Sequence, residues 1–99
     1  MKHWLVMATL LAAPTVHALA ADVAAGEKKA AVCFACHGKD GHPAMKNYPT
    51  LAGQSREYLV VALKGYRDGT RLDPIMAPMA KPLKDEDMEN IAAYFAQFK

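Results

Sequence analysis

Two thiols and an imidazole stand close together in the chain: Cys33, Cys36 and His37. Their spacing is Cys-x-x-Cys-His, the pattern by which a c-type haem is attached to a protein. On a helical turn, positions three and four apart share a face, so both sulfurs can reach neighbouring vinyl groups of one porphyrin edge. His37 would then lie beneath the iron. The motif predicts one covalently bound haem c with its iron and, through it, an electron-transfer protein rather than an enzyme.

The other face of an iron bound by His37 needs a second ligand, and the loops of this chain offer methionines. Met76 lies in Asp-Pro-Ile-Met-Ala-Pro-Met at 73–79, where prolines on both sides stiffen the backbone without a helix. The remaining candidates, in order, are Met79 and Met45. Histidine and methionine together would close both axial positions, and methionine raises the reduction potential. If Met76 does not bind, the alternatives are a haem sensor and a peroxidase.

The start of the chain has the pattern of an export signal. A lysine and a histidine precede an apolar run at 4–13, Pro14 follows, and small residues lead to Ala20. The run is only about half of the roughly 20 residues that a membrane-spanning helix needs, and Pro14 would interrupt it. We therefore expect a secretory signal peptide over 1–20, a single domain over 21–99, a periplasmic location and no stable membrane insertion.

Size and charge restrict the function further. A domain of the size of 21–99 usually needs a staple such as a metal or a large prosthetic group. Loss of Lys2 with the signal lowers the formal net charge from +2 to +1, so the chain lacks the basic footprint of a nucleic-acid-binding protein. Scattered lysines could still form a weakly basic rim for an acidic redox partner. They are Lys28, Lys29, Lys39, Lys46 and Lys81.

Three segments have the periodicity of helices and none has that of a strand, which predicts an all-α fold. They run from about Asp22 to Cys33, from Ser55 to Gly69 and from about Asp85 to Phe98. Asp22 and Ser55 are suitable N-caps, and Met88 belongs to the apolar stripe of the last helix. Gly26 inside the first helix indicates a close approach of another helix. Irregular stretches rich in Gly or Pro, at 38–53 and 70–84, separate the three helices.

Together these residues resemble the class I c-type cytochromes, in particular the small bacterial cytochromes c-553 and the half-domains of dihaem cytochromes c-4. The resemblance covers nearly all of 21–99. It rests on Cys33–Gly41, Asn47–Gln54, Arg71, Met76–Met79 and Ile91–Phe95. It implies a class I cytochrome c fold, in which three main helices with irregular loops wrap around one covalently bound haem.

The resemblance also implies roles for single residues. The first methionine of the Met-x-x-Met pair binds the iron in this family, which selects Met76. The glycine equivalent to Gly26 packs against the aromatic residue equivalent to Tyr94, where the first and last helices cross. Arg71 is a candidate partner for a haem propionate. A proline carbonyl accepts a hydrogen bond from the proximal histidine, and Pro43 is the candidate, although it is displaced by one residue.

Two further residues stand out. Lys84 occupies the position where relatives place Ser or Thr to cap the last helix, although lysine cannot accept the free N–H bonds and its charge opposes the helix dipole. His42 follows His37 by five residues in a loop with Gly and Pro. We expect its side chain to be exposed to solvent and not to bind the iron.

The sequence therefore predicts a periplasmic electron carrier of a respiratory chain, cycling one haem iron between Fe(II) and Fe(III). Expected partners are a quinol–cytochrome c reductase, a terminal oxidase or a periplasmic dehydrogenase. The first alternative is an electron-transfer subunit of a periplasmic oxidoreductase or terminal oxidase complex. A thiol–disulfide redox protein using Cys33 and Cys36 would normally have a βαβ pattern, which is absent. A zinc site from these thiols, His37 and His42 would place adjacent residues poorly around one tetrahedral ion.

Overall fold

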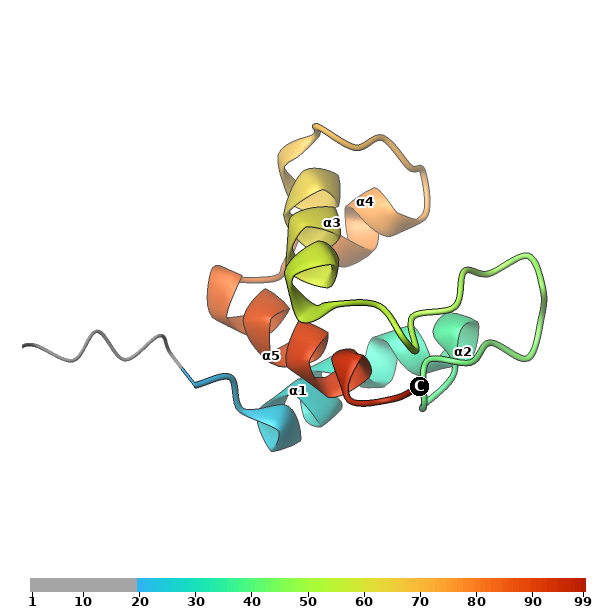
Figure 1. The fold of residues 1–99 in the computed structure, drawn as a ribbon. Helices are drawn as coiled ribbons and strands as arrows, with labels where there is room; N and C mark the ends of the chain where they lie inside the picture. The colour runs from blue at the N-terminus through green and yellow to red at the C-terminus, as the bar shows by residue number, and fades with distance from the viewer. Residues whose placement is uncertain (1–19) are drawn as a thin grey trace, which may run out of the picture.

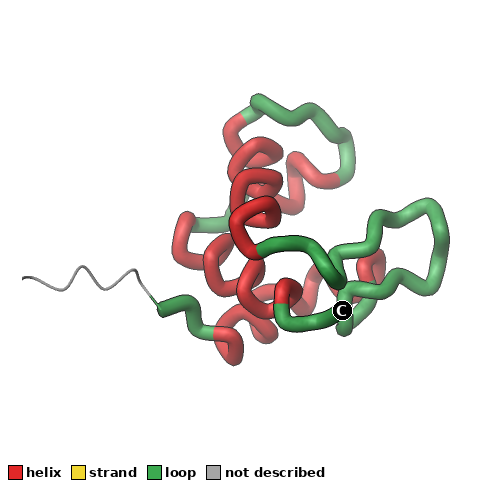
Figure 2. Tube along the Cα trace, in the orientation of Figure 1, coloured by secondary structure: helices red, strands yellow, loops and turns green. Residues whose placement is uncertain are grey.

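The computed structural model describes residues 20–99, so the predicted signal peptide, apart from Ala20, lies outside the described residues. Within that range the regular elements are helices and no strand occurs, as the all-α prediction requires (Figure 2). In chain order they are α1 (Val23–Lys29), a 3-10 turn η1 (Ala30–Cys33), α2 (Phe34–His37), α3 (Arg56–Asp68), α4 (Met76–Ala80) and α5 (Asp85–Ala96). None of these helices combines the length and the apolar character that crossing a membrane requires.

The helices pack around α5. It contacts α1 on one side and α3 on another, while α4 packs against α3 (Figure 1). One cluster of buried apolar side chains fills the space between these elements: Ala30, Leu59, Val60, Ile91, Ala92, Tyr94 and Phe95. Met88 is fully buried, as predicted. Among residues 20–99, Phe95 and Met88 are the large side chains that are less than 2 % exposed, so the protein part of the core is small.

Residues next to the helix ends explain where α1 and α3 begin and where α3 ends. Asp22 and Ser55 each accept a hydrogen bond from the backbone N–H three residues later, which confirms both N-caps. Gly69 ends α3 with a φ of 86°, a conformation that favours glycine. The first predicted helix is helical over its length, but after Lys29 it tightens into a 3-10 turn.

The stretch predicted as irregular between 70 and 84 contains a helix, α4, so that prediction is wrong there. Asp73 orders the turn that leads into α4, because its Oδ1 accepts from the N–H groups of Ile75 (2.9 Å) and Met76 (2.8 Å), whereas the N-cap residue Ile75 makes no side-chain cap hydrogen bond. Pro78 falls in the first turn, where its missing N–H would have no partner within the helix. The proline that suggested an irregular loop is therefore compatible with this short helix.

The backbones of α1 and α5 meet at Gly26. A Cβ at this position would overlap the carbonyl oxygen of Asn90 and lie 2.5 Å from its carbonyl carbon. The predicted close approach is confirmed: the atoms nearest to a Cβ at Gly26 belong to the backbone of Asn90 and Ile91. Packing of Gly26 against the ring of Tyr94 stays a prediction. That ring lies one helical turn further along α5, between Phe34 (5.8 Å between centroids) and Phe98 (5.2 Å). The Asp22 N–H also donates to Asn90 Oδ1, at 2.9 Å.

We expect Gly26→Leu to destabilise the folded protein by about 1–3 kcal/mol, although leucine is the better helix former. The added side chain meets backbone atoms of α5, which cannot rotate away as a side chain could. Denaturant titration of the haem-loaded protein measures the change. Ala24→Leu, at an exposed position of α1, is the matched control and should leave the unfolding midpoint nearly unchanged. Equal stability of the two variants would show that the crossing has no close packing.

The last helix starts at Asp85, as predicted, with Lys84 as its N-cap, and it ends at Ala96, two residues before the predicted end. Lys84 has the extended backbone of an N-cap, and its N–H donates to Asp87 Oδ2 at 2.9 Å. The reverse hydrogen bond of a capping box is missing, because an ammonium group has no acceptor for the Asp87 N–H. Lys84 therefore takes part in only one of the two hydrogen bonds of a capping box, and the side-chain acceptor that Ser or Thr would provide is missing, as predicted.

Lys84→Ser should supply the missing acceptor and remove a charge from the positive end of α5. We expect it to raise the free energy of unfolding by about 0.5–2 kcal/mol and to leave the reduction potential almost unchanged. Lys81→Ser, which removes the same charge from an exposed residue just after α4, should not stabilise the protein. An unfolding midpoint that is the same for both variants would contradict a capping role for position 84.

Candidate functional site

The Cys-x-x-Cys-His motif lies where η1 passes into α2. Cys33 is the last residue of η1, and Cys36 and His37 are the last two residues of α2. The backbone of the motif is therefore helical, as the attachment of both sulfurs to one porphyrin edge requires. Gly38 ends the turn with a φ of 82°. A side chain there would collide with the carbonyl oxygen of His42, so glycine is needed at this position.

Two open cavities adjoin at the motif. One, of about 110 Å³, lies between the motif, α3 and α5, and the other, of about 250 Å³, lies between the motif, the loop at 47–49 and α4. Five residues line both: Cys33, His37, Pro49, Tyr66 and Met76. The motif and the predicted sixth ligand therefore share one site.

His37 is 6 % exposed, and its Nδ1 lies 2.8 Å from the carbonyl oxygen of Pro49. A protonated Nδ1 donates this hydrogen bond, which fixes the ring and leaves the Nε2 lone pair for a metal. The prediction of Pro43 as the acceptor is wrong. The loop folds back where Leu51 and Ala52 donate to the carbonyl of Gly41, which brings Pro49 against α2.

The sequence offered a signal for Pro49 as the hydrogen-bond acceptor of His37. It belongs to the stretch Asn47–Gln54 on which the family resemblance rests. Residue spacing from His37 favours the nearer Pro43, because spacing alone does not show where the loop folds back against α2. The observed hydrogen bond crosses 12 positions of the chain.

The three candidate methionines lie in different surroundings. Met76 is half-buried, begins α4 and lines both cavities. Met79 is 39 % exposed and lines the second cavity, and Met45 is 61 % exposed and lines neither. The arrangement therefore favours Met76 as the partner of His37 across the site, and iron ligation by Met76 stays a prediction.

Arg71 lies on the wall of the first cavity. Its Nη1 donates to the hydroxyl of Tyr58 at 3.2 Å, and its guanidinium lies over the ring of Tyr66, 4.8 Å from the centroid. The hydrogen bond with Tyr58 raises the pKa of Arg71, so the group stays positively charged. The position agrees with a role beside a haem carboxylate, which remains a prediction. The sequence analysis did not identify Tyr58 or Tyr66 as site residues, because their place at the cavity depends on how α3 packs in the fold.

The donor set and the walls fit a haem. Imidazole and thioether are common axial ligands of haem iron, and two thiols stand at the spacing that haem attachment needs. The walls of the first cavity are mostly apolar, as a porphyrin plate requires. Its apolar lining includes Leu51, Leu59, Leu63, Ile91 and Phe95.

The two other chemistries considered for the cysteines find less support. Burial, and secondarily the neighbouring Cys36, raises the pKa of the Cys33 thiol to about 11. Thiol–disulfide enzymes need the opposite shift, because the thiolate is the nucleophile. Residues 20–99 hold no group of three or more His, Cys, Asp or Glu side chains arranged for a metal ion. His42 is exposed, as expected, and its Nε2 lies 2.7 Å from the carbonyl oxygen of Lys99.

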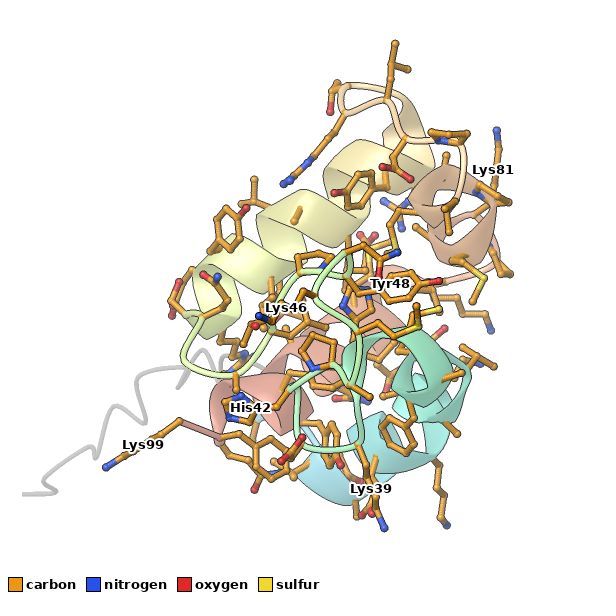
Figure 3. The ribbon with its side chains drawn as sticks, turned by 90° about the vertical axis from the view of Figure 1, so that its right-hand side faces the viewer. Lys39, His42, Lys46, Tyr48, Lys81 and Lys99 are labelled. Atoms are coloured by element: carbon orange, nitrogen blue, oxygen red, sulfur yellow. The ribbon has the colours of Figure 1, made fainter. Side chains whose placement is uncertain are left out.

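The lysines proposed as a rim differ in their surroundings. Lys29 pairs with Asp87 and Lys39 with Glu27, each at 3.7 Å. Figure 3 faces the loop after the motif: Lys46 lies near Tyr48 at its centre, Lys39 at the lower edge and Lys81 near the upper edge. None of these lysines lines either cavity, and Lys39, Lys46 and Lys81 are spread over the face on which Tyr48 lies rather than gathered in one dense patch.

Comparison with known proteins identifies relatives. A family model described as cytochrome c matches residues 23–99. Cytochrome c-554(548) of Halomonas halodenitrificans is 50 % identical over 80 residues, 78 % of this chain and 96 % of that protein. The thiosulfate dehydrogenase electron acceptor of Thiomonas intermedia is 38 % identical over 105 residues, 100 % of this chain and 48 % of that protein.

A solved structure is also similar. The crystal structure of reduced recombinant cytochrome c4 from Pseudomonas stutzeri has a TM-score of 0.75 and 43 % sequence identity, covering 81 % of this chain and 47 % of that one. This chain spans about half the length of that cytochrome c4 and of the thiosulfate dehydrogenase electron acceptor. The likeness to the longer proteins therefore concerns one part of each.

Proposed function

This chain belongs to the cytochrome c family and is a haem-based electron carrier, and from that premise we propose a periplasmic carrier whose iron is bound by His37 and Met76. One observation carries the proposal: these two side chains, from α2 and α4, line the same pair of cavities together with Cys33. When bound, haem supplies an iron that alternates between the ferrous and ferric states. The residues around it determine which reactions that iron performs.

Each of these residues has a separate task. Cys33 and Cys36 hold the porphyrin to the chain through thioether bonds. The carbonyl of Pro49 keeps the His37 ring in one orientation and one tautomer, so that ligation needs no rearrangement when the iron changes its charge. Asp73 holds the backbone of Met76 at the start of α4. With both axial positions closed, no site is left for a substrate, so we propose that the protein transfers electrons and catalyses no reaction of its own.

We propose export by a signal peptide at 1–20 and partners among the redox proteins of the periplasm. The apolar run at 4–13 supports export. The lysines on the face that carries Tyr48, a residue of the second cavity, support brief docking of an acidic partner beside the haem. A quinol–cytochrome c reductase, a terminal oxidase and a periplasmic dehydrogenase all remain candidates.

A second candidate function is that of a dedicated acceptor within one oxidoreductase system. The relative from Thiomonas intermedia is named for accepting electrons from thiosulfate dehydrogenase, and it aligns with the whole of this chain. A dedicated acceptor should co-purify with one dehydrogenase or be reduced by it much faster than by other donors. A free carrier should exchange electrons with several partners at comparable rates.

The proposal is tested on the exported, purified protein. We expect haem to stay with the chain in denaturing acid, pyridine treatment to give the spectrum of thioether-linked haem, and titration to give one reversible one-electron step. The ferrous protein should bind carbon monoxide only weakly, because Met76 occupies the sixth position. A protein without covalent haem would overturn the proposal, and rapid binding of carbon monoxide would favour the sensor or peroxidase alternatives.

A further inference from the structure

Arg71 is fixed to α3 along its whole length. Its backbone N–H donates to the carbonyl oxygen of Gly65 at 3.1 Å. A Cβ on Gly65 would lie 3.1 Å from the Cβ of Arg71, so the arginine stem lies directly on the helix. From there the guanidinium passes over the ring of Tyr66 and ends at the hydroxyl of Tyr58, two helical turns before Gly65. These contacts place the side chain along α3, with both Arg71 and Tyr58 exposed at the surface.

This position gives the first cavity a polar edge. Arg71, Tyr58 and Tyr66 all line it, opposite apolar side chains of α5 such as Ile91. Guanidinium has five N–H donors, and one is used by Tyr58, so others remain for an anion. The Tyr58 hydroxyl accepts from Arg71 and keeps its own proton to donate. The pair can thus present donors from two side chains to one carboxylate.

We propose that Tyr58 is a positioning residue, whose hydroxyl holds the Arg71 guanidinium at the first cavity so that it binds a haem carboxylate there. The inference rests on the proposed function, since it requires a bound haem. It differs from the role expected for Arg71 alone, because it assigns the orientation of that side chain to a residue of α3.

The arrangement couples protonation of the haem carboxylate to reduction of the iron. A guanidinium beside a carboxylate favours its ionised form and lowers its pKa by about 1–3 units. Reduction changes the charge of the iron, so a plot of reduction potential against pH should change slope at the pH where that carboxylate titrates. This change of slope is the bend that the test measures. The groups of the chain that face Arg71 are Tyr58 and Tyr66 from α3 and Asp73 from the segment before α4. Asp73 is already engaged with the N–H groups of α4.

The test compares Tyr58→Phe, Arg71→Gln and the double variant in the haem-loaded protein, by measuring reduction potential against pH. Arg71→Gln should move the bend to higher pH by about one unit. Tyr58→Phe should move it in the same direction by a smaller amount. In the Arg71→Gln background, Tyr58→Phe should cause no further shift, because it acts through Arg71.

Arg56→Gln is the matched control. It removes the same charge from α3, the helix on which the Arg71 side chain lies, but Arg56 pairs with Glu89 at 2.8 Å and does not line the cavity, so the bend should stay in place. An unmoved bend in Tyr58→Phe, or an equal shift with and without Arg71, would overturn the inference. Tyr58→Leu repeats the measurement with a second side chain that lacks the hydroxyl. Haem content is determined in parallel: absence of haem in the unaltered protein overturns the proposed function, whereas bound haem with an unmoved bend overturns only this inference.

Discussion

Replacing both Cys33 and Cys36 by alanine should give a chain that releases its haem in acidic denaturing extraction and is largely unfolded. The thioether bonds are the covalent link that the motif provides. We expect the fold to depend on the porphyrin as well, because among residues 20–99 nine apolar residues are buried and two of the large ones are fully enclosed. A domain of this size has a marginal core by itself, and a haem bound in the two cavities at the motif would extend that core.

Haem extraction and far-ultraviolet circular dichroism measure the two effects separately. Each single variant, Cys33→Ala or Cys36→Ala, should keep haem through its remaining thioether bond and retain helix. Ala35→Ser, at the exposed position between the cysteines, is the control and should behave as the unaltered protein. A double variant that stays folded without haem would count heavily against the assignment of the cavities to a haem.

Met76→Ala should abolish the near-infrared charge-transfer band between sulfur and ferric iron, and it should lower the reduction potential. Loss of the thioether removes the ligand that favours ferrous iron, and axial ligands and their surroundings move haem potentials over about 0.8 V. Met76 is chosen because it lines both cavities and its N–H is held by Asp73. Near-infrared spectroscopy and potentiometry provide the two readouts.

Met79→Ala is the matched control, since it removes a thioether three residues further along α4. It should keep the band, with at most a small change in potential, because Met79 lies at the edge of the second cavity only. Met45→Ala, at an exposed loop position, should have no effect. Loss of the band in Met79→Ala together with its persistence in Met76→Ala would show that the ligand was assigned to the wrong residue.

The parts of the fold that depend on local chemistry could be predicted from the sequence. Ser55 and Gly69 have side-chain and backbone properties that start and stop a helix, and α3 lies between them. Asp22 caps α1 for the same reason. The motif itself needs only a helical turn, so its geometry followed from residue spacing.

The parts that depend on where distant segments meet could not be predicted in this way. Pro49 reaches His37 only because the loop turns back at Gly41, and residue spacing alone pointed to Pro43. Gly26 indicated a close contact without identifying Asn90 as its partner. The helix α4 was missed because prolines normally argue against helices, whereas here Pro78 falls in the first turn and Asp73 orders the turn that leads into the helix.

The contact between α1 and α5 has a consequence for how the domain assembles. The hydrogen bond from Asp22 to Asn90 joins residues 68 positions apart, so its formation encloses the motif, both loops and α3 in one long loop. The entropy lost in closing such a loop must be met before the contact stabilises the fold, which slows the step that brings α1 and α5 together. We expect hydrogen exchange of the mature protein to show α1 and α5 opening as one cooperative unit.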